Sequence, residues 1–250
     1  MKERTPRLSR IHVDAPLAKG VRLALPDSAT AHLLRVLRLG VGDTCVLFNG
    51  DGNDYAATIV SVAKKIAEVQ VTDVYPIDNE SPLRITLAQA LARGEKMDWI
   101  IQKATELGVS AIQPIVSERT EVKLDGERAD KRHAHWRAVA IAACEQCGRA
   151  QLPLIAEPLA LQHYATKLGS AALKLMLDPE AELTLRTLSL ADVSNIELAI
   201  GPEGGFSQRD LAQLKAAGFI GLRLGPRVLR TETAGLAVLA ALQGLVGDFG

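Results

Sequence analysis

The sequence predicts an α/β protein with a mainly parallel sheet, preceded by a smaller β-rich domain. Beyond residue 83, short apolar runs alternate with stretches of helical periodicity, an order typical of parallel strands joined by helices. Before residue 76, short strands alternate with turn clusters. The chain has 250 residues, of which 48% are hydrophobic, so it can bury one large core or two smaller ones.

The first domain, predicted for residues 1–75, has the pattern of a small barrel with one helix. Thr44–Phe48 and Tyr55–Val62 flank a cluster of Asn, Asp and Gly, which is a β-hairpin signature. Residues 65–71 alternate in polarity as a third strand, and Ser28–Leu37 has helical spacing. Short strands with one helix are typical of a small β-barrel.

Pro76–Pro82 is polar and bounded by prolines, which predicts a linker before a second domain at residues 83–250. In that domain the apolar periodicity predicts helices at Glu95–Leu107, Asp130–Gln146 and Glu232–Val246. Strands are expected at Arg84–Leu91, Ala111–Val116, Leu152–Ala156, Ala172–Leu177, Ile196–Ile200 and Ile220–Leu224.

The last helix is apolar around almost its whole circumference. Such a helix has to be buried on more than one side, either deep in the core or between subunits. We favour the second alternative and therefore expect a homodimer.

Composition excludes several classes of protein. No apolar run reaches the ~18 residues of a membrane span, and the polar start lacks a signal-peptide core, so we expect a cytoplasmic protein. The odd cysteine count, Cys45, Cys144 and Cys147, argues against a disulfide framework. Cys144 and Cys147 have C-x-x-C spacing but lie in a helical pattern without a second pair, so we expect packing or site lining and no metal.

The net charge is zero, but residues 1–38 hold eight basic and three acidic side chains. This local excess is a modest indication of contact with a phosphate backbone, although composition alone favours a solvated surface. The RNA-contacting candidates in this segment are Arg7, Arg10, Arg35 and Arg38. Lys96 and Lys103, on a predicted helix of the second domain, are weaker candidates.

Two glycine–proline segments carry the strongest functional signal. Gly201-Pro202-Glu203-Gly204-Gly205 and Gly225-Pro226 each follow a predicted strand. Ligands of parallel sheets bind beyond the carboxyl ends of the strands, and glycine lets the backbone approach them closely. The sequence contains neither G-x-G-x-x-G nor G-x-x-x-x-G-K-[ST], and no nucleophile elbow. The loops therefore favour a neutral base such as adenine, read by main-chain groups.

These motifs resemble the SPOUT class of methyltransferases, and more narrowly the RsmE family, which methylates N3 of a uridine in small-subunit (16S) ribosomal RNA. Gly201–Gly205 and Leu224–Ala234 carry the resemblance. Lys96–Gly108 and His32–Asp43 also resemble family segments. So does Glu145–Arg149, where Cys147 replaces a common serine. The resemblance spans nearly the whole chain.

The resemblance implies a C-terminal SPOUT domain with a trefoil knot and an N-terminal PUA-like, RNA-binding β-barrel. It implies S-adenosylmethionine as cofactor, no metal, a homodimer with sites at its interface, and ribosomal RNA or the small ribosomal subunit as partner. The cofactor-binding residues it implies are Leu177, Ile200, Gly201, Pro202, Glu203, Gly204, Gly205, Leu224, Gly225, Val228, Leu229, Arg230, Thr233 and Ala234.

Methyl transfer from a sulfonium to nitrogen is a direct displacement, and uridine N3 must also lose a proton. Glu203 is the candidate base, or else it shapes the loop. Arg149 is the candidate group that stabilises the uridine anion or grips a phosphate, or else it satisfies carbonyls at a helix end. Two alternatives stay open: methylation of another RNA position, such as a tRNA or large-subunit site, and a non-catalytic RNA-binding module.

Overall fold

The structure is a computed structural model that describes residues 9–63, 66–122, 126–168 and 173–250. The chain forms two compact units. The N-terminal unit comprises Met1–Asn79 and Cys144–Leu152, and the C-terminal unit comprises Glu80–Ala143 and Pro153–Gly250. The boundary after Asn79 falls within the predicted linker, whereas nothing in the sequence pattern indicated that Cys144–Leu152 would join the first unit.

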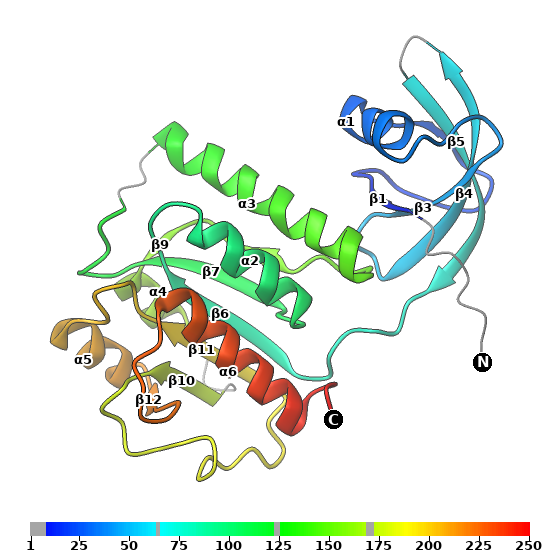
Figure 1. Cartoon of the computed structure of the whole chain (residues 1–250). Helices are drawn as coiled ribbons and strands as arrows, with labels where there is room; N and C mark the ends of the chain where they lie inside the picture. The colour runs from blue at the N-terminus through cyan, green and yellow to red at the C-terminus, as the bar shows by residue number, and fades with distance from the viewer. Residues whose placement is uncertain (1–8, 64–65, 123–125, 169–172) are drawn as a thin grey trace. The chain divides into compact units, whose positions relative to one another are not determined.

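A five-stranded sheet forms the N-terminal unit (Figure 1). Its order is β1 (Arg10–His12), β3 (Thr44–Phe48), β4 (Asn53–Ala63), β5 (Ile66–Pro76) and β2 (Arg22–Ala24). The β3–β4 pair is antiparallel with Leu47 opposite Tyr55, which confirms the predicted hairpin. Among the described strands of this five-stranded sheet, β1 and β3 pair in parallel and the other pairs are antiparallel.

The predicted helix of this unit is present in two pieces. An α-helical turn, α1 (Asp27–Ala31), continues into a π-helical turn, η1 (His32–Val36). Leu33 of η1 is fully buried and belongs to the same core cluster as Ile11, Leu47 and Ile59. Apolar residues that alternate along β3, β4 and β5 complete this core, since alternate side chains point to the same face of a sheet.

The C-terminal unit contains a parallel sheet, which confirms the predicted α/β fold. The strand order is β12 (Ile220–Leu222), β10 (Leu173–Leu177), β11 (Asn195–Ile200), β6 (Arg84–Ala90), β7 (Ala111–Val116) and β8 (Leu154–Ile155), and β9 (Leu159–Ala160) also pairs with β7. The trefoil knot implied by the family resemblance stays a prediction.

Helices cover both faces of this sheet (Figure 1). On one face lie α2 (Lys96–Glu106), α3 (Gly126–Cys147) and α6 (Thr231–Val246), and on the other α4 (Leu161–Lys167) and α5 (Gln208–Ala216). Strand β6 shows the division: Ile85 and Leu87 belong to the first core, and Ala88 and Ala90 to the second. The apolar face predicted for helix α2 is confirmed, because Met97, Ile100, Ile101 and Ala104 are all buried.

Helix α6 buries one broad side and leaves the other exposed. Val238, Leu239 and Leu242 lie in the core, whereas Leu245 is 56% exposed. Gln243 is fully buried; its Nε2 donates to the carbonyl of Leu107 and its Oε1 accepts from Ser81 Oγ. No helix in the described part of the chain has the length and apolar character needed to cross a membrane.

Candidate functional site

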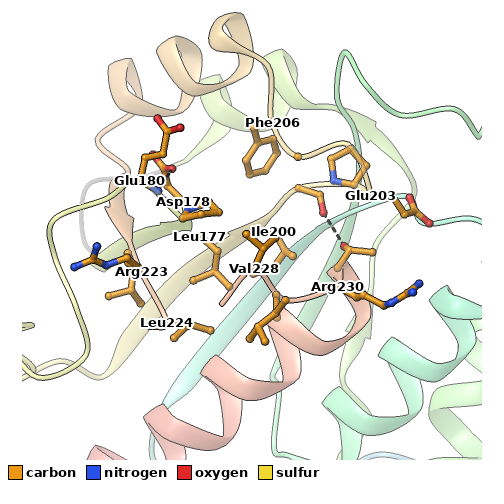
Figure 2. Close-up of a pocket in the computed structure, with 18 of the residues that line it drawn as sticks. Leu177, Asp178, Glu180, Ile200, Glu203, Phe206, Arg223, Leu224, Val228 and Arg230 are labelled. Atoms are coloured by element: carbon orange, nitrogen blue, oxygen red, sulfur yellow. Dashed lines mark hydrogen bonds between the residues drawn. The ribbon is translucent and has the colours of Figure 1, made fainter. Parts of the chain in front are cut away.

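A cavity of about 600 Å³ lies at the carboxyl ends of β10, β11 and β12. Its volume is in the range of small-molecule sites, roughly 300–1,000 Å³. Both glycine–proline loops form its walls, and Figure 2 shows Asp178 and Glu180 across the cavity from Glu203. Both loops thus line one cavity, as expected for two loops that follow the ends of parallel strands.

Most residues predicted for the cofactor line this cavity: Leu177, Ile200, Gly201, Pro202, Glu203, Gly205, Leu224, Gly225, Val228, Leu229, Arg230 and Ala234. Gly204 and Thr233 do not line it. Thr233 is exposed on the first turn of α6, where Thr231 and Ala234 face the cavity instead. The sequence interpretation missed Arg119, Asp178, Pro179, Glu180, Phe206, Gln208, Leu211, Leu222, Arg223, Arg227 and Thr231.

Glycine is required by the backbone at this site. A Cβ on Gly201 would lie 3.0 Å from the backbone nitrogen of Phe206 and 3.1 Å from the carbonyl carbon of Gly205. Gly225 has a φ of +111°, which L side chains rarely adopt. The two loops therefore present main-chain groups to a ligand.

Thr231 joins the first loop to α6 and to the sheet. Its Oγ1 donates to the carbonyl of Gly201 at 2.7 Å and accepts from Nε2 of Gln89 at 2.9 Å (Figure 2 shows the first contact as a dashed line). Gln89 is fully buried on β6, and Thr231 is 6% exposed. Buried hydrogen bonds of this kind fix the loop in one conformation.

Glu203 is held by groups at the start of α2. Its Oε1 accepts from Nζ of Lys96 at 2.9 Å and from the backbone N–H of Arg93 at 3.1 Å. Partial burial opposes ionisation of Glu203, but these hydrogen bonds outweigh it and lower the pKa of the carboxyl below its ordinary value. A carboxylate stabilised in this way is a weaker base, so the geometry favours the loop-shaping role over proton abstraction.

Lys96, a weaker RNA candidate, bridges two carboxylates instead. Its Nζ also lies 3.5 Å from Oε2 of Glu232 at the start of α6. The hydrogen bond to Glu203 raises the pKa of the Lys96 ammonium, which keeps it charged. Lys96 therefore connects the first loop, α2 and α6. Lys103 pairs with Glu106 on its own helix.

The remaining RNA candidates lie in the N-terminal unit, except Arg7, which is outside the described residues. Arg10 is not on the surface. Its side chain is 8% exposed, and Nη2 lies 2.7 Å from Asp54 Oδ1 and donates to the carbonyl of Arg149 at 3.0 Å. The structure therefore argues against Arg10 as an RNA-contacting residue, because its guanidinium is buried and already paired with Asp54. Arg35 and Arg38 are exposed on and just after η1, and Arg38 has a left-handed φ of +56°.

Arg149, the second catalytic candidate, belongs to the N-terminal unit, whereas the cavity lies within the C-terminal unit. Its side chain is only 6% exposed. A catalytic role for Arg149 stays a prediction.

The cysteines have the surroundings of packing residues. Cys45 and Cys144 are buried, Cys147 is half-buried, and none of the three forms a disulfide with another described residue. Burial raises the pKa of the Cys45 thiol to about 11, which makes it unreactive at neutral pH. Within the described ranges, no three His, Cys, Asp or Glu side chains gather in a way that could hold a metal ion.

The sequence and the fold both match a known class of protein, the RNA methyltransferases. The RNA methyltransferase domain model matches residues 79–243, and the RNA methyltransferase PUA domain model matches residues 25–72. Sequence relatives narrow the class. Ribosomal RNA small subunit methyltransferase E of Buchnera aphidicola from Acyrthosiphon pisum is 33% identical over 97% of this chain and 96% of its own length. The Bacillus subtilis protein of the same name is 30% identical over 84% of this chain and 85% of its own length.

Solved structures agree with these relatives. The ribosomal RNA small subunit methyltransferase E of Neisseria gonorrhoeae, bound to S-adenosyl methionine, has a TM-score of 0.92 and 40% identity. The alignment covers 97% of this chain and 100% of that one. A Legionella pneumophila methyltransferase with bound SAM also has a TM-score of 0.92, with 41% identity over 97% of this chain and 100% of its own. The chain therefore belongs to the ribosomal RNA small subunit methyltransferase E family, which confirms the resemblance.

Proposed function

We propose that this protein transfers a methyl group from S-adenosylmethionine to N3 of a uridine in 16S ribosomal RNA. The observation that carries the proposal is the cavity between the two glycine–proline loops, in a chain whose solved relatives hold this cofactor. The bound cofactor supplies an electrophilic methyl group on a sulfonium.

The residues of the cavity fit that cofactor. Leu177, Ile200 and Leu224 give apolar surface for an adenine ring, and the glycine loops offer main-chain donors and acceptors for its edge. On the opposite side from Glu203, Asp178 and Glu180 offer carboxylates for hydroxyl or ammonium groups.

The chain's own contribution is alignment. A direct displacement requires the attacking nitrogen and the methyl group in line, and effective orientation accounts for a large part of such a rate enhancement. Thr231 and Glu203 hold the first loop against β6, α2 and α6, so the position of its backbone is set before a ligand arrives. Glu203 acts as a loop anchor in this proposal, and N3 loses its proton to another group.

The partners we propose are small-subunit ribosomal RNA, in the cytoplasm, and a second copy of the chain. The exposed side of α6 supports a homodimer. Leu245 is 56% exposed there, and Trp99 on the neighbouring helix α2 is 53% exposed. Large exposed apolar side chains on adjacent helices are typical of a subunit interface.

The test is methyl transfer from labelled S-adenosylmethionine to 16S ribosomal RNA, to small subunits and to tRNA, followed by mass spectrometry of the nucleosides. We expect 3-methyluridine in the small-subunit RNA alone. A methyl on tRNA, on large-subunit RNA or on a ribose would establish the alternative methyltransferase. Failure to bind S-adenosylmethionine in calorimetry, with RNA present, would establish a non-catalytic RNA-binding module.

A further inference from the structure

Arg119 lies on the wall of the cavity although no motif in the sequence singled it out. It follows β7, whose carboxyl end faces the same edge of the sheet as the glycine–proline loops. Its Nη1 donates to the carbonyl of Gly204 at 2.8 Å, and the residue is exposed. Arg119 therefore lies where the cavity opens to solvent.

The turn that carries Arg119 is rigid. The backbone N–H of Thr120 donates to the carbonyl of Ser117, and the N–H of Ser117 donates to Oγ1 of Thr120, both at 3.0 Å. The N–H of Glu118 donates to Oδ1 of Asp210 at 3.2 Å. Asp210 is 3% exposed and forms the capping box of α5 with Ser207. These contacts hold the base of the Arg119 side chain in place before any ligand binds.

Arg119 differs from Arg93 and Lys96, the two cations beside Glu203, because they form ion pairs and it forms none among the described residues; Arg223, Arg227 and Arg230 of the cavity lining share this property. Arg93 forms an ion pair with Glu121, and Lys96 pairs with Glu203 and Glu232. In the part of the chain that the structure describes, no carboxylate lies within ion-pair distance of Arg119, whose contact at Gly204 is a neutral carbonyl. Its positive charge is uncompensated at the cavity mouth.

We propose that Arg119 binds a phosphate of the RNA substrate beside the nucleotide whose base enters the cavity. The proposal rests on the proposed function. A base that reacts inside a pocket leaves its stack while its backbone stays outside, which puts phosphates at the mouth. The planar guanidinium can donate two parallel hydrogen bonds to phosphate oxygens. The hydrogen bond from Nη1 to the carbonyl of Gly204 holds the guanidinium beside the first glycine–proline loop.

Two variants separate charge from hydrogen bonding: Arg119→Gln keeps an N–H donor and loses the charge, and Arg119→Lys keeps the charge and loses the planar fork. Arg209→Gln on α5, an exposed arginine that does not line the cavity, is the matched control. For Arg119→Gln we expect the KM for RNA to rise about tenfold, with kcat within about twofold of the unchanged protein. The magnitude of the slope of log affinity against log salt concentration should fall by roughly 0.7–0.9, which corresponds to the loss of one phosphate contact. Arg119→Lys should restore part of the affinity, and Arg209→Gln should change nothing.

RNA affinity measured by fluorescence anisotropy with S-adenosylhomocysteine bound, and cofactor affinity measured by calorimetry, complete the experiment. Weaker cofactor binding in Arg119→Gln would mean that the residue only supports the loop. A lower kcat with unchanged KM would place it on the reacting base. An unchanged salt slope would also overturn the proposal. If the unaltered protein methylates no ribosomal RNA, the proposed function fails, while the anisotropy measurement still decides whether Arg119 contacts phosphate.

Discussion

At the scale of single residues, the site depends on side chains whose hydrogen bonds fix the backbone of the first glycine–proline loop. Glu203 is the clearest example, because its carboxylate accepts from Lys96 and from the N–H of Arg93. Sequence alone left open whether this residue takes a proton or shapes the loop. The two hydrogen-bond donors to its carboxylate favour the second role, and the sequence alone does not show that they are its neighbours.

Glu203→Gln tests that role. Because the folded pKa of Glu203 is lowered, the carboxylate contributes to loop stability above the ordinary pKa of a glutamate and loses that contribution as pH falls through the lowered folded value. The residue is therefore ionised throughout the neutral range. We expect cofactor affinity to fall about fivefold, while the pH profile of kcat between about pH 6 and 9 keeps its shape.

Single-turnover rates with saturating cofactor provide the readout. A large loss of kcat, together with the disappearance of a limb from the pH profile, would identify Glu203 as the base and contradict the loop-anchoring role.

Gly201→Ala adds one methyl group where the backbone leaves no room. Its Cβ would lie 3.0 Å from the nitrogen of Phe206 and 3.2 Å from the Cα of Gly205, so the loop has to shift. We expect cofactor affinity, measured by calorimetry, to fall at least about tenfold. Gly244→Ala on α6 is the control, since nothing lies within 4 Å of that Cβ. It should leave binding unchanged and raise the midpoint of thermal unfolding. Equal affinity in the two variants would show that the loop tolerates a side chain.

At the scale of elements, hydrophobic periodicity located most strands and helices of the C-terminal unit. Strand β7 was predicted with its observed bounds, and β6 and α2 to within one residue at each end. Periodicity works there because each element has a face in one of two cores. The short elements β1, β2 and β9 escaped prediction, since two or three residues carry no period. The π-helical turn η1 has the same apolar spacing as an α-helix and was not distinguished from one.

Helix α6 is joined to the first glycine–proline loop through the side chain of Thr231, and Thr231→Val tests that connection. The substitution preserves shape but removes the hydroxyl that links Gly201 to Gln89, leaving a buried amide and carbonyl without this partner. We expect a loss of about 1–2 kcal/mol in the free energy of unfolding, measured by urea denaturation, with weaker cofactor binding. Thr231→Ser, which keeps the hydroxyl, should retain most of both. Wild-type stability in the valine variant would show that the hydrogen bonds contribute little.

At the scale of the whole molecule, the exposed side of α6 is the surface through which we expect two copies of the chain to associate. Leu245→Glu places a charge on that side, and because the leucine is 56% exposed, the fold of the single chain should be unaffected. If α6 forms the subunit interface, sedimentation velocity should show the unaltered chain as a dimer and the variant as a 26.8 kDa monomer.

Leu154→Glu, a leucine on the edge strand β8 that is 66% exposed, is the matched control and should leave the dimer intact. A dimer that persists in Leu245→Glu would place the interface elsewhere.

The sequence by itself determined the class of fold, the two glycine–proline loops and the family, because these depend on local periodicity and on residue types that only a few backbone conformations accept. Tertiary structure decided which side chains the loops depend on. Residues separated by more than a hundred positions, such as Lys96 and Glu203 or Gln89 and Thr231, meet only once the parallel strands have aligned their carboxyl ends. The same folding buried Arg10 in an ion pair and left Arg119 at the cavity mouth, since pairing and burial are properties of three-dimensional neighbours.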